Sequence, residues 1–265
     1  MKTIGSTIIM LALASSLFAD NGKELKLASP DGTHEIVFYQ KQVSPAVNEL
    51  CYRVDYKSQP VVNESRAGLE LDNRIWEMAL GVRNLKQPAC WMDNLEVDSV
   101  TYQLETNLTW QPLYGERSSV RDHYRAGTLC LSKKDNSGYR LNIEVRAYNE
   151  GVAFRYFFPE HPKAIFHKVV GDLTEYALPA GTKAWTEQWA QAFFERLNID
   201  DIKHPVERTL TFELPNGKWA ALADADVDDW CLTKYLVSTD KKNTLTSVMY
   251  SPVDVVTYYA TPWKI

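Results

Sequence analysis

The sequence contains few cysteines and none of the short motifs that mark common catalytic or metal sites. Its four cysteines are spread over 265 residues with no Cys-x-x-Cys pair, so the spacing of a structural zinc site is absent. No Gly-x-Ser-x-Gly, His-Glu-x-x-His or phosphate-loop motif occurs, and the five histidines are scattered. The local sequence therefore does not indicate a zinc protease, an α/β-hydrolase or a nucleotide-binding loop.

Basic residues are not in excess either. The chain has 29 Lys and Arg residues against 34 Asp and Glu residues, which gives a formal net charge of −5 at pH 7. Binding to nucleic-acid phosphates requires clustered positive charge. We therefore expect no nucleic-acid partner.

Long hydrophobic runs are missing beyond the N-terminus. Lys2 precedes the short apolar run Ile4–Phe18, and Ala19 is a suitable last residue of a signal peptide. The run is shorter than the roughly 20 residues that a membrane-spanning helix needs. We expect residues 1–19 to be a signal peptide, the chain to be exported, and no membrane span to remain after its removal.

The cysteines leave the disulfide state open. An exported protein can form disulfides, and four cysteines allow three complete pairings that spacing cannot distinguish. Each cysteine has hydrophobic or aromatic neighbours in the sequence, which is typical of buried thiols. We favour buried free thiols over disulfide bridges.

Helical periodicity is weak, and alternation with a period of two residues dominates. The clearest case is Tyr139–Ala147, in which apolar and polar residues alternate before an Asn-Glu-Gly turn and a second run, Val152–Phe158. Further strands are expected at 35–39, 50–56, 100–110, 209–214, 218–223, 243–250 and 254–259. The best candidate for a short helix is Ile75–Leu80. The pattern predicts an all-β protein, with residues 20–265 forming one large antiparallel sandwich and few short helices.

The sequence contains 8 Trp and 14 Tyr residues, and two segments mix aromatic with charged residues. Trp110–Tyr124 has no consistent period, as expected for an interaction surface or a loop held within a larger assembly. Ala184–Arg196 interleaves four rings with Glu187, Gln191 and Glu195. Such rings either pack a β-core or stack on sugars, and for a single ring packing is the favoured role.

An acidic run begins at Asp224 and continues through Asp226, Asp228 and Asp229. It is similar to the start of a calcium loop, but an EF-hand would need Gly where Asp229 stands and Glu where Tyr235 stands. We expect instead a strand whose acidic residues share one solvated face.

Several longer segments together resemble the N-terminal region of glycoside hydrolase family 97, exported α-glycosidases found mainly in Gram-negative gut bacteria of the Bacteroides type. The segments, in chain order, are Ser29–Gly32, Ser65–Leu71, TWQPLYGERSSVRDHY (109–124), AYNEGVAFRYFFPE (147–160), ALPAGTKAW (177–185), AQAFFE (190–195), ERTLTFELPNGKWAALADADV (207–227) and SPVDVVTYYATPWKI (251–265). One departure is Asp122, where the family usually has Asn.

The resemblance implies a β-super-sandwich similar to that of galactose mutarotase. Family members continue into a (β/α)8 barrel that carries the catalytic carboxylates, so we expect this chain to end at Ile265 before that barrel. The chain alone should then have no catalytic residue. The implied location is the periplasm or cell surface of a Gram-negative bacterium.

The resemblance also implies a calcium ion beside the substrate, with one glutamate supplied by the sandwich. Glu195 is the matching residue. Calcium takes six to eight oxygen ligands, so one carboxylate would hold it poorly without the barrel. The residues expected to contact substrate or the barrel are Trp110, Glu116, Arg117, Arg121, His123 and Tyr124.

Three functions remain open at this point. The first is a non-catalytic domain that braces the barrel and closes one side of the pocket for an α-linked glucoside or galactoside. The second is a stand-alone carbohydrate-binding or interaction module. The third is a mutarotase-like epimerase, which rests only on a shared fold and is weaker because fold does not fix function.

Overall fold

The computed structural model describes residues 19–20, 23–72, 93–134, 138–161 and 166–265. Strands dominate these residues, and the one helical element among them is a single 3-10 turn at Ile199–Asp201. The prediction of an all-β sandwich is confirmed. The predicted helix at Ile75–Leu80 lies outside the described residues. No described helix is long and apolar enough to cross a membrane.

The largest sheet has nine strands, in the order β1-β7-β9-β10-β11-β23-β18, with β8 paired to β9 and β22 paired to β11. Its strands are β1 (Ala19–Asp20), β7 (Leu95–Tyr102), β8 (Thr106–Trp110), β9 (Val120–Lys133), β10 (Arg140–Tyr148), β11 (Val152–Phe158), β18 (Asp224–Ala225), β22 (Tyr259–Ala260) and β23 (Trp263–Lys264). All of its pairings are antiparallel.

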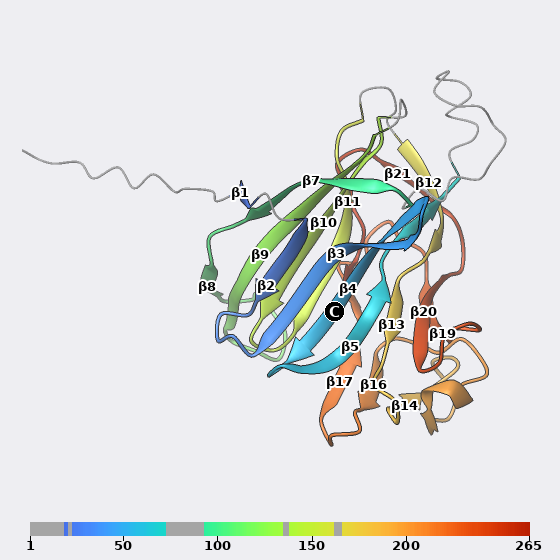
Figure 1. The fold of residues 1–265 in the computed structure, drawn as a ribbon. Helices are drawn as coiled ribbons and strands as arrows, with labels where there is room; N and C mark the ends of the chain where they lie inside the picture. Colours follow the sequence, from blue (N-terminus) through green and yellow to red (C-terminus); the bar gives the residue numbers. More distant parts are fainter. Residues whose placement is uncertain (1–18, 21–22, 73–92, 135–137, 162–165) are drawn as a thin grey trace, which may run out of the picture.

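A four-stranded antiparallel sheet, β2-β3-β4-β5, lies in front of this sheet (Figure 1). It contains β2 (Glu24–Ala28), β3 (His34–Ser44), β4 (Val47–Tyr56) and β5 (Gln59–Arg66). The two layers meet through aromatic rings. Phe154 of β11 lies 5.1 Å from Phe38 and 5.0 Å from Tyr52, measured between ring centroids. Rings at this spacing form the tightly packed centre of the sandwich.

The remaining described strands form three smaller sheets: β21-β12-β6, β13-β20-β19 and β15-β14-β16-β17. Their strands are β6 (Leu69–Leu71), β12 (Phe166–Asp172), β13 (Glu175–Ala177), β14 (Lys183–Thr186), β15 (Glu195–Asn198), β16 (Leu210–Glu213), β17 (Trp219–Leu222), β19 (Thr233–Val237), β20 (Thr244–Met249) and β21 (Val253–Val256). One hydrophobic core runs through all the layers.

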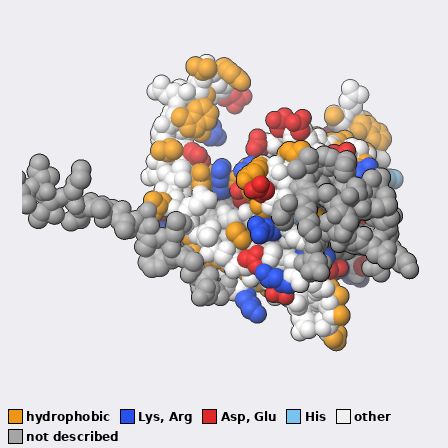
Figure 2. Space-filling view, turned by 90° about the horizontal axis from the view of Figure 1, so that it is seen from above, with side chains coloured by type: hydrophobic (Ala, Val, Ile, Leu, Met, Phe, Trp, Pro, Cys, Tyr) orange, Lys and Arg blue, Asp and Glu red, His pale blue; other side chains and the backbone are white. Residues whose placement is uncertain are grey.

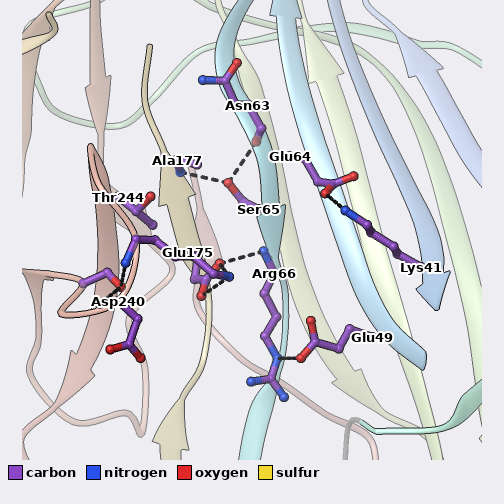
Figure 3. Close-up of polar contacts among 12 residues, drawn as sticks. Lys41, Glu49, Asn63, Glu64, Ser65, Arg66, Glu175, Ala177, Asp240 and Thr244 are labelled. Carbon is purple, nitrogen blue, oxygen red and sulfur yellow. Dashed lines mark hydrogen bonds and ion pairs between the residues drawn. The ribbon is translucent and has the colours of Figure 1, made fainter. Parts of the chain in front are cut away.

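Polar contacts fasten the front layer to the neighbouring strand β13 (Figure 3). The Ser65 hydroxyl accepts a hydrogen bond of 2.8 Å from the backbone N–H of Ala177. The backbone N–H of Arg66 donates to the Glu175 carboxylate at 3.2 Å, and Lys241 pairs with the same carboxylate at 2.7 Å. These bonds satisfy backbone groups where two sheets meet without a shared ladder.

The alternation predicted for Tyr139–Ala147 and its hairpin with Val152–Phe158 are confirmed. In β10 the even-numbered polar residues face outward, and Leu141, Ile143 and Val145 are buried. The turn at Asn149–Gly151 joins β10 to β11, with Ala147 opposite Val152. The Asn216-Gly217 hairpin likewise joins β16 to β17, and Gly217 has a positive φ of 76° that suits this turn.

Two predictions about strands are wrong. The expected single strand 100–110 is interrupted after Tyr102, and Leu104 is 80% exposed between β7 and β8. The acidic run is not a strand with one solvated face. Only Asp224 and Ala225 form a strand, and Asp226 and Asp229 adopt positive φ values typical of turns. The Asp224 side chain is only 6% exposed and forms an ion pair with Arg208.

The described thiols of Cys51, Cys130 and Cys231 are free, as favoured from the sequence. Cys51 is buried, and the other two are half-buried. Cys90 lies outside the described residues.

Candidate functional site

The first aromatic segment forms the end of a hairpin between β8 and β9. Trp110 lies opposite Val120, and residues 111–119 join the two strands. Trp110 is 52% exposed, and Leu113 and Tyr114 are almost fully exposed. In the space-filling view, hydrophobic side chains gather on protruding parts of the described surface (Figure 2). Apolar groups gathered on a surface in this way are typical of interaction sites.

Below the tip of this hairpin, a glutamate joins two basic side chains of β9. The Glu105 carboxylate lies 2.7 Å from Nε2 of His123 and 3.0 Å from Nε of Arg125. These two hydrogen bonds, from His123 first and then Arg125, lower the pKa of Glu105. Because a carboxylate only accepts hydrogen bonds, Nε2 of His123 carries the proton in this contact. Nδ1 of the same ring is buried, and no group of the described residues forms a hydrogen bond with it.

Tyr124 points to the opposite face of β9, because successive side chains in a strand alternate. There its ring lies 5.0 Å from the ring of Tyr148. The Arg146 guanidinium lies 4.6 Å from the Tyr124 ring centroid and 4.5 Å from that of Trp263, and Arg155 lies 4.3 Å from the same Trp263 ring. These cation–π contacts stabilise the arrangement of the side chains on the outer face of this sheet.

The six residues expected to contact substrate or the barrel have different surroundings in the structure. Arg121 donates a 3.0 Å hydrogen bond to Asn107 on β8. Glu116 and Arg117 are exposed, and within the described ranges no ion pair links Glu116 to Arg121. His123 and Tyr124 have the partners described above on opposite faces of β9. The six residues therefore form a protruding edge, and they do not converge on one point.

The second aromatic segment contains β14, β15 and the connection between them. Trp185 of β14 is 39% exposed, Phe194 is 64% exposed, and Phe193 is almost fully exposed. Trp189 is also exposed, so the packing role favoured for these rings from the sequence is wrong. Because its neighbours Ala184 and Thr186 are buried and side chains alternate along a strand, the ring of Trp185 stands on the outer face of the sheet β15-β14-β16-β17. We call Trp185, Trp189, Phe193, Phe194 and Glu195 the aromatic ledge.

Glu195 is the first residue of β15 and is exposed at the end of this ledge. Its backbone carbonyl accepts a hydrogen bond from the Thr186 hydroxyl at 3.2 Å, which fixes the start of the strand. Across the described part of the chain, no ion pair involves its carboxylate, and no three His, Cys, Asp or Glu side chains are grouped as metal ligands. These residues therefore offer calcium one carboxylate and not a complete site.

The hairpin and the ledge belong to different sheets. Sequence reasoning missed Glu105, Arg146 and Trp263, which hold the predicted residues in place. Alternation placed Arg146 on the polar face of β10, but its contact with Trp263 joins residues more than a hundred positions apart. Nothing in the local pattern could indicate that contact.

Fold and surface together define a large β-sandwich module that presents aromatic and charged side chains at two edges. The family model described as the N-terminal domain of glycosyl hydrolase 97 matches residues 27–265. The chain therefore belongs to glycoside hydrolase family 97 as an N-terminal domain, and the resemblance noted in the sequence is confirmed.

Relatives place this domain within longer proteins. A retaining alpha-galactosidase from Bacteroides thetaiotaomicron is 23% identical over 263 residues, which cover 93% of this chain and 35% of that protein. A family 97 enzyme from Pseudoalteromonas sp. strain K8, solved in complex with acarbose, aligns with a TM-score of 0.77 and 21% identity over 91% of this chain and 35% of its own. A beta-arabinopyranosidase aligns with a TM-score of 0.73 and 16% identity, covering 91% of this chain and 39% of that chain. The chain thus spans about a third of the length of these relatives.

Proposed function

We propose that this chain is the non-catalytic sandwich domain of an exported α-glycosidase that hydrolyses α-linked glucosides or galactosides. In the full-length enzyme it braces the catalytic (β/α)8 barrel and closes one side of the sugar pocket. The catalytic carboxylates then lie in the barrel and not in this chain. The observation that carries the proposal is the exposed aromatic ledge, because a monomeric surface rarely leaves several large rings together in water unless they meet a partner.

Calcium is part of this proposal through Glu195. Its carboxylate is exposed and forms no ion pair with any described residue, so it can serve as one ligand of an ion whose other oxygens come from the barrel. The ion would neutralise negative charge beside the bound sugar. The side chains of this domain would position that ion and the neighbouring rings.

The β8–β9 hairpin is the second contact that we assign to the barrel or to the oligosaccharide. Trp110 offers a ring face, and Arg121 and the His123–Glu105 pair offer hydrogen-bonding groups at the same edge. The apolar run at the N-terminus supports export to the periplasm or cell surface.

A stand-alone carbohydrate-binding module is the alternative, and the same exposed rings favour it, because aromatic faces also stack on sugars. Two measurements on the 265-residue chain distinguish these functions. We expect no hydrolysis of a p-nitrophenyl α-glucoside or α-galactoside, since the catalytic carboxylates are assigned to the barrel. Robust turnover by purified protein would contradict that assignment. Calorimetric binding of maltose or melibiose by the chain alone would favour the stand-alone module.

A further inference from the structure

Two hollows lie on either side of the end of β23. The larger, of about 540 Å³, is lined mainly by core-facing side chains such as Val54, Phe212 and Leu222. The smaller, of about 380 Å³, lies on the other side and is lined by Arg146, Tyr148 and Trp263 among others. Both hollows share four lining residues: Glu150, Gly151, Val152 and Ile265.

The strand β23 runs between β11 and β18 and is antiparallel to both. Lys264 lies opposite Phe154 on one side and opposite Asp224 on the other. Ile265 continues this register, because it exchanges two backbone hydrogen bonds with Ala223, of 2.8 and 3.1 Å. A strand that continued beyond Ile265 in the same direction would therefore run between the first residues of β11 and the strand β17.

Each of the two strands that border this path has one edge that is not paired with another described strand there. Among the described strands, β17 pairs only with β16, and the first residues of β11 pair only with β10. In an antiparallel ladder, backbone N–H and C=O groups point alternately to the two neighbouring strands. Since Ala223 bonds to Ile265, the groups of Ala221 and Trp219 point to the same side. By the same alternation, the groups of Val152 on β11 point toward them.

We propose that the two hollows lie on the two faces of one site for an additional β-strand. The occupant of this site is an extended segment joined to Ile265. That segment would lie antiparallel to β11 and to β17 and would bond to Val152 on one side and to Ala221 and Trp219 on the other. It would join the nine-stranded sheet to the sheet β15-β14-β16-β17. The chain spans about a third of the length of its relatives, so a covalently attached segment is the occupant that the register favours.

The faces of the site predict the pattern of the segment. Lys264 lines the larger hollow, and Trp263 lines the smaller one. By alternation, the first and third residues after Ile265 face the larger, apolar hollow beside Leu222 and Ala220. The second residue faces the smaller hollow near Arg146 and Glu150, where a polar side chain is accommodated. The expected pattern is therefore apolar-polar-apolar.

The test lengthens the chain after Ile265 by Val-Thr-Val-Thr-Val-Thr and compares it with the same chain lengthened by Thr-Val-Thr-Val-Thr-Val. The two extensions have one composition and opposite phase. We expect the first to raise the melting temperature by at least about 3 °C over the 265-residue chain and the second to raise it much less, because a shift of one residue exposes the apolar set. Amide exchange at Val152, Ala221 and Trp219 should slow by roughly tenfold or more in the first alone.

A third variant carries Pro at the second added position, which removes the N–H expected to bond to Ala221. We expect it to lose most of the gain in melting temperature. Equal gains for both phases would overturn the proposal, because they would show non-specific association. No gain and no slower exchange for the first extension would overturn it as well. Neither outcome depends on sugar binding or on glycosidase activity, so the proposed function is tested separately.

Discussion

The ammonium group of Lys264 forms an ion pair with the carboxylate of Asp172 inside the sandwich, where the Asp172 side chain is completely buried. The second carboxylate oxygen of Asp172 accepts hydrogen bonds from the backbone N–H and the hydroxyl of Thr174, at 3.0 and 2.6 Å. The Tyr156 hydroxyl continues the network to Thr174 at 2.7 Å. Burial lowers the pKa of Lys264, but the charges of Asp172 and Asp224 outweigh it and hold the pKa above its ordinary value.

Replacing either partner of this pair should destabilise the fold strongly. Asp172→Asn leaves a buried ammonium without its counter-charge, and Lys264→Met leaves a buried carboxylate. We expect each to lower the free energy of unfolding by about 3 kcal/mol or more, as measured by urea denaturation. The double variant Asp172→Asn/Lys264→Met should lose clearly less than the sum of the two.

The matched control is the exposed pair Arg196–Glu213, whose side chains are 39% and 30% accessible. Arg196→Met should cost less than about 1 kcal/mol, because exposed ion pairs contribute little. Losses of equal size at the buried and the exposed pair would show that burial of the Lys264–Asp172 pair has no energetic consequence.

A buried histidine should make the stability depend on pH. His167 is 2% exposed and stacks on Phe158 with ring centroids 5.2 Å apart. Burial, with a smaller contribution from the charge of His161, lowers the pKa of His167 from 6.5 to about 4. Between these values the unfolded chain binds a proton that the folded chain excludes. Stability is therefore fully present above about pH 6.5 and falls as the pH drops toward 4, by up to about 3 kcal/mol.

The variant His167→Phe keeps a ring at this position and removes the titration. Its free energy of unfolding should fall less than that of the wild type between pH 6.5 and 4.5, with carboxylate titration common to both. His204→Gln, at an exposed position, should follow the wild-type curve. Parallel curves for all three proteins would refute a depressed pKa at His167.

Cys51 should be the least reactive of the described thiols. It is 4% exposed, and burial, followed by the charges of Glu64 and Glu49, raises its pKa to about 11. At pH 8 roughly one molecule in a thousand then carries the thiolate, which is the reactive form. With iodoacetamide and peptide mapping, we expect the half-buried Cys130 and Cys231 to be labelled first and Cys51 only after unfolding in urea. Labelling of Cys51 in the native protein at the rate of Cys130 would contradict this.

The sequence predicted local features of the fold but not the contacts of these buried groups. Strict alternation at Tyr139–Ala147 and the Asn216-Gly217 turn predicted strands and hairpins, because both signals lie within a few residues. The Asp172–Lys264 pair joins residues 92 positions apart. Asp224 looked like a surface residue, because the partner that buries it, Arg208, lies in another segment.

The same limit explains the outcome at the candidate site. Period-two alternation predicts which way Trp185 points relative to its neighbours, but it cannot tell whether another layer covers that face. The structure leaves the face open, so the rings are exposed. The residues Trp110 and Glu195, singled out in two segments, lie in different sheets because strand order in space does not follow strand order in the chain.

The proposed role of Glu195 leads to opposite expectations for two forms of the protein. In the 265-residue chain its carboxylate is exposed, so Glu195→Gln should change the free energy of unfolding by less than about 0.5 kcal/mol. Adding calcium should not raise the melting temperature of that chain, because one carboxylate cannot replace the six to eight oxygens that the ion requires. A clear calcium-induced rise would contradict a shared site.

In a longer protein that contains the barrel, calcium should raise the melting temperature, because an ion that binds only the folded state stabilises it. Glu195→Gln should weaken this effect by replacing a charged ligand with a neutral amide. Glu116→Gln, which removes an exposed carboxylate from the β8–β9 connection, should leave the calcium response unchanged. If both variants reduce the response equally, the effect comes from net charge. If neither does, Glu195 does not bind the ion, and its place on the aromatic ledge reflects the interface alone.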